Sequence, residues 1–552
     1  MGSEMCIRDR VIGMECNAIR QAVCANEVVY DSVVEVPLEN DVILPDYCPD
    51  IVKVLKCTVN ACVSSTQVQG RQMTLEGMCT VHLLYLGEDS AGSSLQLRSI
   101  DTRMPYSKTV DLKGEAQRLL VLAQMDSSYC NCRAVSKRRL ELKLSLSHRV
   151  CALSAGEQQL IGDSAEDTQQ PQGLQLRKRM LEQCCFVAQP REIIDIREEL
   201  ELGGSKPAVR SMISSRGCAV MSDHKLISGK IVTKGELRIT VLYNGESSTE
   251  EGAQSEKENI QQMDFVLPIS AVIDAPGADD GCLCLADYSL CELEISPKLD
   301  QNGENTLFEL EAKVSATAQV CRIQQAQVAD DCYSTRYECE GQLRPLSFLE
   351  SMQPVEESCL YKGEVELPEG VEEILSGWGQ VSGSAVRFEE QEGKQTAVLQ
   401  VNLDLCLLAL DADGSIQFYN KTEQMECPFA AGAGDDSRLL FCPQLTVVGF
   451  DYNRTTANLA VRCEVQVRGM LCRLKRCNLL EEVTVDESKP IEHDQDCSLT
   501  IYYADAGETL WEIAKRYHTA MQSVLEANSQ LELSPQAGVS KREMLLIPIL
   551  SH

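Results

Sequence analysis

The sequence lacks the usual signatures of a metal centre or an enzyme active site. It has no CxxC pair and only 6 His, although a structural zinc site needs two well-spaced pairs of ligands. No phosphate-binding glycine loop, no GxSxG nucleophile motif and no HExxH metal helix occurs. We therefore expect a protein that is not an enzyme and that has no catalytic residues, no metal and no cofactor.

Basic residues and long apolar runs are also scarce. The chain has 51 Lys and Arg against 83 Asp and Glu, a formal net charge of −32. This excess of negative charge argues against nucleic acid or an anionic membrane as the main partner. No stretch approaches the roughly 18 apolar residues that span a bilayer, and no charged-then-apolar leader precedes the first predicted strand. We expect an acidic, cytoplasmic protein without a transmembrane segment.

Length and composition predict several globular domains. With 552 residues, of which 44% are hydrophobic, the chain can form three or four domains with buried cores. Residues 1–13 are set apart, because Met1–Arg10 resembles translated sequencing-adapter sequence. The native start is then either Met14 or missing.

Cysteine, by contrast, is abundant, with 27 residues. The spacings are irregular, and several cysteines lie inside apolar runs, as Cys79, Cys151, Cys406 and Cys463 do. In a reducing cytoplasm such cysteines behave as small buried hydrophobic side chains. The alternative is that some of them form intermolecular disulfides later, in an assembled structure.

Residues 25 to about 480 show the period-two alternation of half-buried strands. Three clear runs, 139–146, 308–314 and 459–467, recur at intervals of roughly 150–170 residues. The sequence therefore predicts a threefold repeat of β-rich units.

Turn signals support the same repeat. Asn244–Gly245 predicts a two-residue hairpin turn in the second unit, and Asp413–Gly414 predicts one in the third. The third turn also has some features of a calcium loop, but no bidentate Glu follows in register. We interpret it as a hairpin turn.

The C-terminal residues 498–550 carry the most specific pattern. The predicted elements are a strand at 500–504, helices that open with the capping boxes Thr509–Glu512 and Thr519–Gln522, and a strand at 544–548. Helical spacing places one apolar face on the first helix, made by Leu510, Ile513, Ala514 and Tyr517. We expect Leu510, Trp511 and Ile513 to be core residues.

This order of elements resembles the LysM domain, and the matching motifs are Gly507–Ala514, Asn528 and Leu545–Pro548. The resemblance implies a βααβ module that in most relatives binds N-acetylglucosamine-containing glycans, such as peptidoglycan, in a shallow groove. By position, the groove residues would be Gly507, Glu508, Thr509, Leu510, Asn528 and Ser529. The chain departs from the family in residues 531–542, which are longer than usual and lack the usual Gly just before the last strand.

A second resemblance begins in the first β-rich unit, at Leu44–Pro45–Asp46–Tyr47–Cys48–Pro49–Asp50–Ile51. This motif resembles one of the SPOCS domain, a β-rich module of spore-forming Clostridia and Bacilli. The second and third units keep only traces of it, at 202–207 and 367–371. Asp46 and Asp50 adjoin prolines that fix the backbone, so we interpret them as turn residues rather than catalytic acids.

Composition also predicts the domain boundaries, because the polar residues 154–173 and the acidic residues 481–497 have the composition of linkers. The predicted map has a foreign segment at 1–13, SPOCS-like β domains at 25–153, 174–323 and 332–480, an acidic linker at 481–497 and a LysM domain at 498–550.

Three SPOCS-like domains followed by one LysM module resembles the SipL family of spore coat morphogenetic proteins. The resemblance implies a mainly β fold of three tandem sandwich-like repeats and a small βααβ domain. It also implies a mother-cell protein that anchors the coat at the forespore surface by binding the SpoIVA-type coat ATPase, with the LysM module associated with that contact.

Two other hypotheses remain open. One is a glycan-binding protein that targets peptidoglycan and uses the β domains as spacer or platform. The other is an enzyme with an unrecognised site in a β unit.

Overall fold

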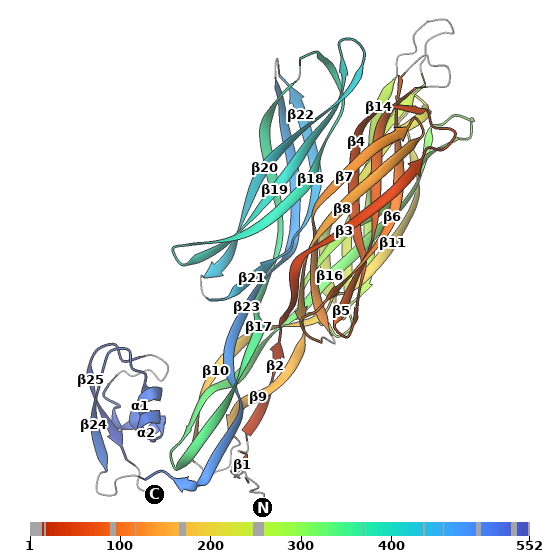
Figure 1. The fold of residues 1–552 in the computed structure, drawn as a ribbon. Helices are drawn as coiled ribbons and strands as arrows, with labels where there is room; N and C mark the ends of the chain where they lie inside the picture. The colour runs from red at the N-terminus through yellow and green to blue at the C-terminus, as the bar shows by residue number, and fades with distance from the viewer. Residues whose placement is uncertain are drawn as a thin grey trace, which may run out of the picture.

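Long β-strands make up most of the protein (Figure 1). The computed structural model describes residues 14–15, 18–88, 95–115, 118–164, 173–246, 259–367, 369–433, 436–455, 458–492, 498–531 and 538–549. The predicted foreign segment 1–13 lies outside the described residues, as do the linker residues 165–172 and 493–497.

The first β-rich unit is a sandwich of two antiparallel sheets, β4–β5–β6 and β3–β8–β7. β8, one of the runs predicted from alternation, buries every second side chain, and these pack against inward side chains of β5. The strands are β3 (Val28–Ile43), β4 (Asp50–Gln69), β5 (Gln72–Glu88), β6 (Leu95–Asp111), β7 (Leu119–Ser136) and β8 (Arg139–Ser154).

The second unit repeats this arrangement. Its sheets are β12–β13–β14 and β11–β16–β15. The strands are β11 (Arg191–Glu201), β12 (Val209–Ile227), β13 (Lys230–Gly245), β14 (Ile260–Asp274), β15 (Leu283–Lys298) and the first half of β16 (Leu307–Ser334).

The third unit has the same strand order, with sheets β18–β19–β20 and β17–β23–β22, and a short strand, β21, also pairs with β23. The strands are β17 (Tyr337–Glu366), β18 (Val371–Gln391), β19 (Lys394–Asp411), β20 (Ile416–Ala433), β21 (Arg438–Phe441), β22 (Gln444–Arg454) and β23 (Asn458–Pro490).

Irregularities in the strand pairing recur at equivalent positions of the three units. The first two register shifts between β4 and β5 fall at Ile51/Lys53 and Val54/Lys56. The same two shifts fall at Val209/Ser211 and Met212/Ser214 in the second unit, and at Val371/Glu373 and Ile374/Ser376 in the third. Since a β-bulge is a specific feature of a fold, the shifts align the three units residue by residue.

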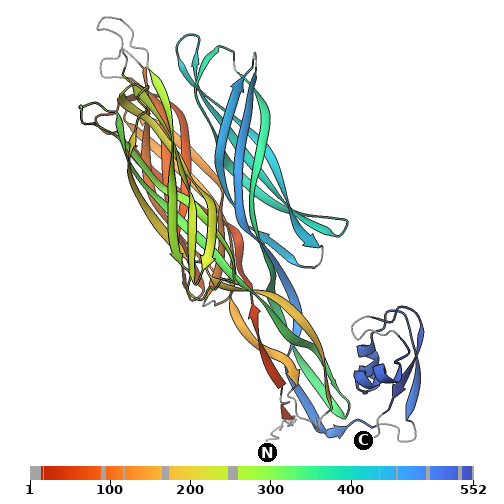
Figure 2. The same cartoon turned by 180° about the vertical axis from the view of Figure 1, so that it is seen from behind.

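The first and last strands of each unit, in chain order, lead beyond the sandwich into a two-stranded ribbon, and the three ribbons pack into a stem (Figures 1 and 2). The ribbons are β2 (Ala18–Ala25) with β9 (Gly156–Ser164), β10 (Leu174–Ala188) with residues 320–334 of β16, and residues 337–352 of β17 with residues 472–490 of β23. The short β1 (Met14–Glu15) pairs with β23. Val23, Leu181 and Leu346, one from each ribbon, belong to one buried cluster. The stem therefore has its own apolar core.

The three units also meet above the stem. One buried cluster contains Leu84, Leu242 and Leu408, which occupy equivalent positions of β5, β13 and β19. Hydrogen bonds add to this contact: Gln124 of the first unit donates to Ser384 of the third at 2.5 Å, and Arg238 of the second donates to the carbonyl of Val448 at 2.7 Å. The repeats thus form one assembly.

The C-terminal module has the order strand, helix, helix, strand, and its helices cover one face of a two-stranded sheet (Figure 1). Its elements are β24 (Leu499–Ala504), α1 (Leu510–Arg516), α2 (Met521–Ala527) and β25 (Glu543–Pro548). The capping box of Thr509 and Glu512 is present at α1, as predicted. The predicted fold class, mainly β with a small βααβ module, is confirmed. Neither α1 nor α2, the helices of the described residues, is long and apolar enough to cross a bilayer.

Two local predictions were wrong. Asn244–Gly245 is not a two-residue turn, because both residues lie in β13 and Asn244 pairs with Ile260. Thr519 does not cap α2: its hydroxyl donates to the carbonyl of Pro548 at 2.8 Å, and the N-cap residue is Ala520. A hairpin turn does lie at Asp413–Gly414, but residues 412–415 connect β19 to β20, so the turn is longer than the predicted two residues.

The predicted linkers are partly strand. Residues 156–164 of the first form β9, which pairs with β2, and residues 481–490 of the second belong to β23. The four cysteines expected to be buried are buried. The structure also contains an intramolecular disulfide between Cys24 and Cys185, which joins the first two ribbons of the stem and which the sequence did not predict.

Candidate functional site

The loop that enters α1 is held by the segment that precedes β25. Gly507 donates its backbone N–H to the carbonyl of Val539 at 2.8 Å, and Val539 donates to the carbonyl of Glu508 at 2.9 Å. A Cβ on Gly538 would lie 2.6 Å from the carbonyl oxygen of Gly507, so only glycine allows this approach. Gly507 itself has a φ of +98°.

Glu508 takes part in a hydrogen-bond network inside the module. Its carboxylate accepts from the hydroxyl of Tyr502 at 2.9 Å, from Arg516 at 3.1 Å and from the backbone N–H of Asp505 at 3.0 Å. The hydrogen bond from Asp505, aided by those from Tyr502 and Arg516, lowers the pKa of Glu508. The side chain thus braces the loop against β24 and α1.

Asn528 ties α2 to β25. Its side-chain amide, only 1% exposed, donates to the carbonyls of Val524 and Leu546 at 2.7 Å each and accepts from the N–H of Leu546 at 2.8 Å. All of its side-chain capacity except one lone pair is used in these bonds. The neighbouring Ser529 is exposed.

The module docks on the end of the stem through one face of α1. The carboxylate of Asp331, in β16, accepts from Trp511 Nε1 at 2.8 Å and from Lys515 Nζ at 2.6 Å. Tyr333 packs edge-on against Trp511, with ring centroids 4.9 Å apart, and donates its hydroxyl to the carbonyl of Thr519 at 2.8 Å. Burial alone would raise the pKa of Asp331, but the hydrogen bonds from Lys515 and Trp511 lower it overall.

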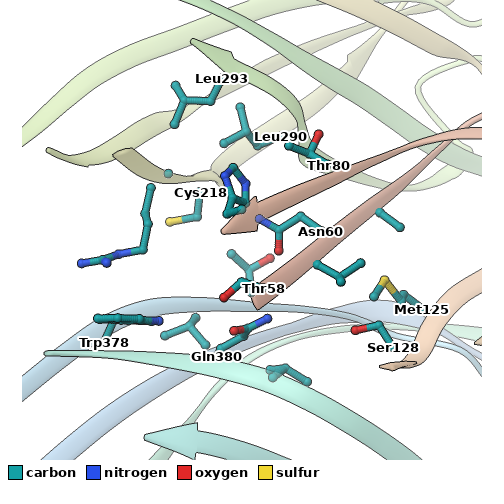
Figure 3. A pocket seen from close by; sticks show the side chains of 18 of the residues that line it. Thr58, Asn60, Thr80, Met125, Ser128, Cys218, Leu290, Leu293, Trp378 and Gln380 are labelled. Atoms are coloured by element: carbon teal, nitrogen blue, oxygen red, sulfur yellow. The ribbon is translucent and has the colours of Figure 1, made fainter. Parts of the chain in front are cut away.

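A cavity of about 360 Å³ lies where the three β-rich units meet (Figure 3). Equivalent strands supply its walls: Thr58 and Asn60 from β4, Cys218 from β12, and Trp378 and Gln380 from β18. The Arg216 guanidinium stacks 3.9 Å from the ring centroid of Trp378, and burial lowers the pKa of Arg216 to about 10. Equivalent positions of the three units thus line one cavity with chemically different side chains.

Recurring contacts hold the segment that enters β4 and its counterpart before β12. The hydroxyl of Tyr85 donates to the carbonyl of Pro49 at 3.4 Å, and Tyr243 donates to Pro207 at 3.2 Å. Glycine stands two residues after each tyrosine, and a Cβ there would lie 2.6 Å from Pro49 Cγ in the first unit and 2.4 Å from Pro207 Cγ in the second. The register places Ala409 and Asp411 at the corresponding positions of the third unit, so this contact is confined to the first two.

Comparison with protein families agrees with this division. The SipL, SPOCS domain family matches residues 50–135 and 208–298, and the LysM domain family matches residues 504–548. The chain carries SPOCS domains of the SipL family and a LysM domain. No similar curated protein and no similar solved structure was found.

The two SPOCS matches begin directly after Pro49 and Pro207, and the third unit has the SPOCS strand order without a family match. That it is a third SPOCS domain therefore stays a prediction. Asp46 and Asp50 of the first SPOCS domain lie beside Arg138, which donates to the carboxylate of Asp50 at 3.0 Å and to the carbonyl of Pro45 at 2.7 Å.

The six predicted groove residues of the LysM domain differ in exposure. Leu510 and Asn528 are buried at 1% each, Glu508 and Thr509 are half-buried, and Gly507 and Ser529 are exposed. Leu510 belongs to the core of the domain, as its helical spacing indicated. Whether these residues bind a glycan stays a prediction.

Sequence reasoning missed two residues that position this domain. Gly538 contacts Gly507, although the last strand had been expected to lack a preceding glycine; its place five residues before β25 was the available signal. Asp331 had no signal, because its partners lie about 180 positions away. Among the described residues, no group of three or more Cys, His, Asp or Glu is placed to hold a metal ion.

Proposed function

We propose that this SPOCS and LysM protein is a non-enzymatic scaffold of endospore coat assembly. In this proposal the LysM domain binds the SpoIVA-type ATPase of the coat basement layer, in the mother cell at the forespore surface. The observation that carries it is the combination of SipL-family SPOCS matches with a LysM domain that exposes an apolar sheet face.

The exposed face is the outer side of the β24–β25 sheet, opposite α1 and α2. Ile501, Tyr503 and Met544 are 56%, 57% and 47% exposed there, and Tyr503 pairs directly with Met544. A cluster of exposed apolar side chains on one small domain is typical of a protein contact. This surface supports a protein partner for the LysM domain.

The hydrogen bonds that the predicted groove residues already make also favour a protein partner over a glycan. A sugar-binding site needs polar groups that are free to bond hydroxyls. Here the carboxylate of Glu508 already accepts from Tyr502, Arg516 and the backbone, and the amide of Asn528 is bonded to α2 and β25.

The alternative is that the LysM domain binds N-acetylglucosamine glycan of peptidoglycan. The exposure of Gly507 and Ser529 favours it, because both predicted groove loops keep one accessible residue. In that case the SPOCS domains would serve as a spacer or platform.

The test compares the full chain with two surface variants for retention of a purified SpoIVA-type ATPase and of purified peptidoglycan. Ile501→Glu puts a charge on the apolar face, and Ser529→Arg puts a bulky side chain at the predicted groove. Val266→Glu, at a residue of β14 that is 59% exposed, is the matched control for added surface charge.

We expect the ATPase to be retained by the wild type, by Val266→Glu and by Ser529→Arg, and to be lost with Ile501→Glu. Retention of peptidoglycan alone, with loss in Ser529→Arg, would replace the scaffold proposal with the glycan-binding one. If Ile501→Glu retains the ATPase as well as the wild type does, the apolar face is not the contact.

A further inference from the structure

We propose that Cys62 and Cys291 are an oxidative modification site that forms a disulfide between the first and second SPOCS domains. The two sulfur atoms lie 2.8 Å apart, although the residues are 229 positions apart in the chain. Cys62 belongs to β4 and Cys291 to β15, which are strands of different SPOCS domains. The inference does not depend on the identity of any coat partner.

The surrounding contacts hold the two strands together without the bond. Arg103 of β6 donates to the carboxylate of Glu294 at 3.1 Å, and Arg191 of β11 donates to the carbonyl of Val63. Both contacts cross the same interface between the two repeats that the thiol pair crosses. Thiols fixed opposite one another in this way can be joined without a large movement of the backbone.

The pair differs from another close pair of thiols, Cys57 and Cys130. Cys57 and Cys130 lie 2.9 Å apart, but both belong to the first SPOCS domain, and Cys132 also contacts Cys57. Cys62 has a single thiol partner, and the link would cross a domain boundary. It would join the same two repeats that the Cys24–Cys185 disulfide joins in the stem.

A small disulfide can reach the pair through the cavity between the units, because Cys291 lines it. The side chain of Cys291 is half-buried, whereas Cys62 is 8% exposed behind it. Cys291 is therefore the sulfur that meets the reagent first, and Cys62 is the resolving sulfur.

The chemistry is an ordinary thiol–disulfide exchange in two steps. The thiol of Cys291 loses its proton to water, and its sulfur attacks a low-molecular-weight disulfide, which releases one small thiolate that takes up a proton. The sulfur of Cys62 then attacks Cys291 Sγ in the mixed disulfide and expels the second small thiol. Two protein thiols are oxidised and one small disulfide is reduced to two thiols.

The pKa values of the two thiols are shifted in opposite directions. The hydrogen bond from Cys291 and the charge of Arg191 lower the pKa of Cys62 against the effect of burial. The hydrogen bond with Cys62 and burial raise the pKa of Cys291. The first step should therefore be slow at neutral pH and faster at alkaline pH, while the second step follows rapidly.

The test maps the cysteines of the full chain after controlled oxidation. The protein is reduced with a phosphine, desalted, exposed to hydroxyethyl disulfide, alkylated with N-ethylmaleimide and digested without reduction for mass spectrometry. The variants are Cys62→Ser and Cys291→Ser, and the control is Cys463→Ser, at a buried cysteine of β23 in the third unit. Re-formation of the Cys24–Cys185 bond reports in each sample that the stem is folded.

We expect a peptide pair joined through Cys62 and Cys291 in the wild type and in Cys463→Ser, formed faster as the pH is raised. In Cys62→Ser, Cys291 should instead accumulate the hydroxyethyl mixed disulfide. The proposal is overturned if Cys62 and Cys291 are both alkylated in wild type that has re-formed Cys24–Cys185, or if Cys62 is joined mainly to another cysteine. If a serine variant fails to fold, the wild type and the Cys463→Ser control still decide between these outcomes.

Discussion

Asp331 is one of the stem residues that hold the LysM domain, and its two hydrogen bonds can be removed separately. Asp331→Asn keeps an oxygen that can accept from Trp511 Nε1 but removes the charge that pairs with Lys515. Asp331→Ala removes both. The two substitutions therefore separate the cost of a lost ion pair from the cost of an unpaired indole N–H.

The expected magnitudes differ accordingly. Lys515 is 44% exposed in its side chain, so losing its partner should cost only about 0.5–1 kcal/mol. Trp511 is 3% exposed, and a buried donor left without an acceptor costs about 1–3 kcal/mol more. A total near 3 kcal/mol for Asp331→Ala would shift the docking equilibrium by roughly a hundredfold.

Fluorescence can report the docking, because the chain has only 2 Trp. In a Trp378→Phe background, emission comes from Trp511, which packs against Tyr333 when the domain is docked. We expect a red shift and faster amide exchange in α1 for Asp331→Ala, a smaller change for Asp331→Asn, and none for Asp195→Asn, at an exposed carboxylate of β11.

The same contact should depend on pH in a defined direction. Because the pKa of Asp331 is lowered in the folded protein, its contribution is complete above the unfolded value of about 3.9 and is lost as the pH falls through the folded value. Docking should therefore weaken only in acid. Unchanged Trp511 emission and α1 exchange in Asp331→Ala would refute this account of the docking.

Three further predictions follow from single contacts. Gly87→Ala should lower stability by about 1–3 kcal/mol in a thermal melt, because its methyl group would overlap the adjacent proline ring, whereas Gly114→Ala, with open space around it, should have little effect. Burial raises the pKa of Asp287 to about 7, so stability should fall as the pH rises from 4 towards 7, and Asp287→Asn should remove that part of the slope in urea titrations. Reducing Cys24–Cys185, which closes a loop of 161 positions, should lower the free energy of unfolding by about 3–5 kcal/mol, and a serine variant at Cys24 should show no response to reductant.

The repeat could be predicted from sequence because a long strand that buries one face shows a regular alternation of apolar and polar residues. The three runs of alternating residues are the central strands β8, β16 and β23, each of which pairs on both sides and buries one face. The LysM domain could be predicted for a similar reason. Its turn, cap and core residues fall within a single short stretch of chain.

The stem could not be predicted, because a two-stranded ribbon gives a weaker trace. In residues 481–490 only Val483 and Val485 are buried, among polar residues that are mostly exposed, so the composition is that of a linker. Gly245 led to a wrong turn prediction for another reason. A glycine is needed there because Pro207 packs on β13, and the residue does not lie in a turn. The site contact at Asp331 was also out of reach, since no local pattern connects β16 with α1.

The length of β23 has a mechanical consequence. One uninterrupted strand of 33 residues, roughly 110 Å at 3.3 Å per residue, runs from the third unit down to the end of the stem beside the LysM domain (Figures 1 and 2). Its ladder with β17 extends from Glu366↔Asn458 to Tyr337↔Pro490. A pulling force between the far end of the units and the LysM domain acts along these strands and across their hydrogen bonds. The bonds then share the load in shear and do not open one after another.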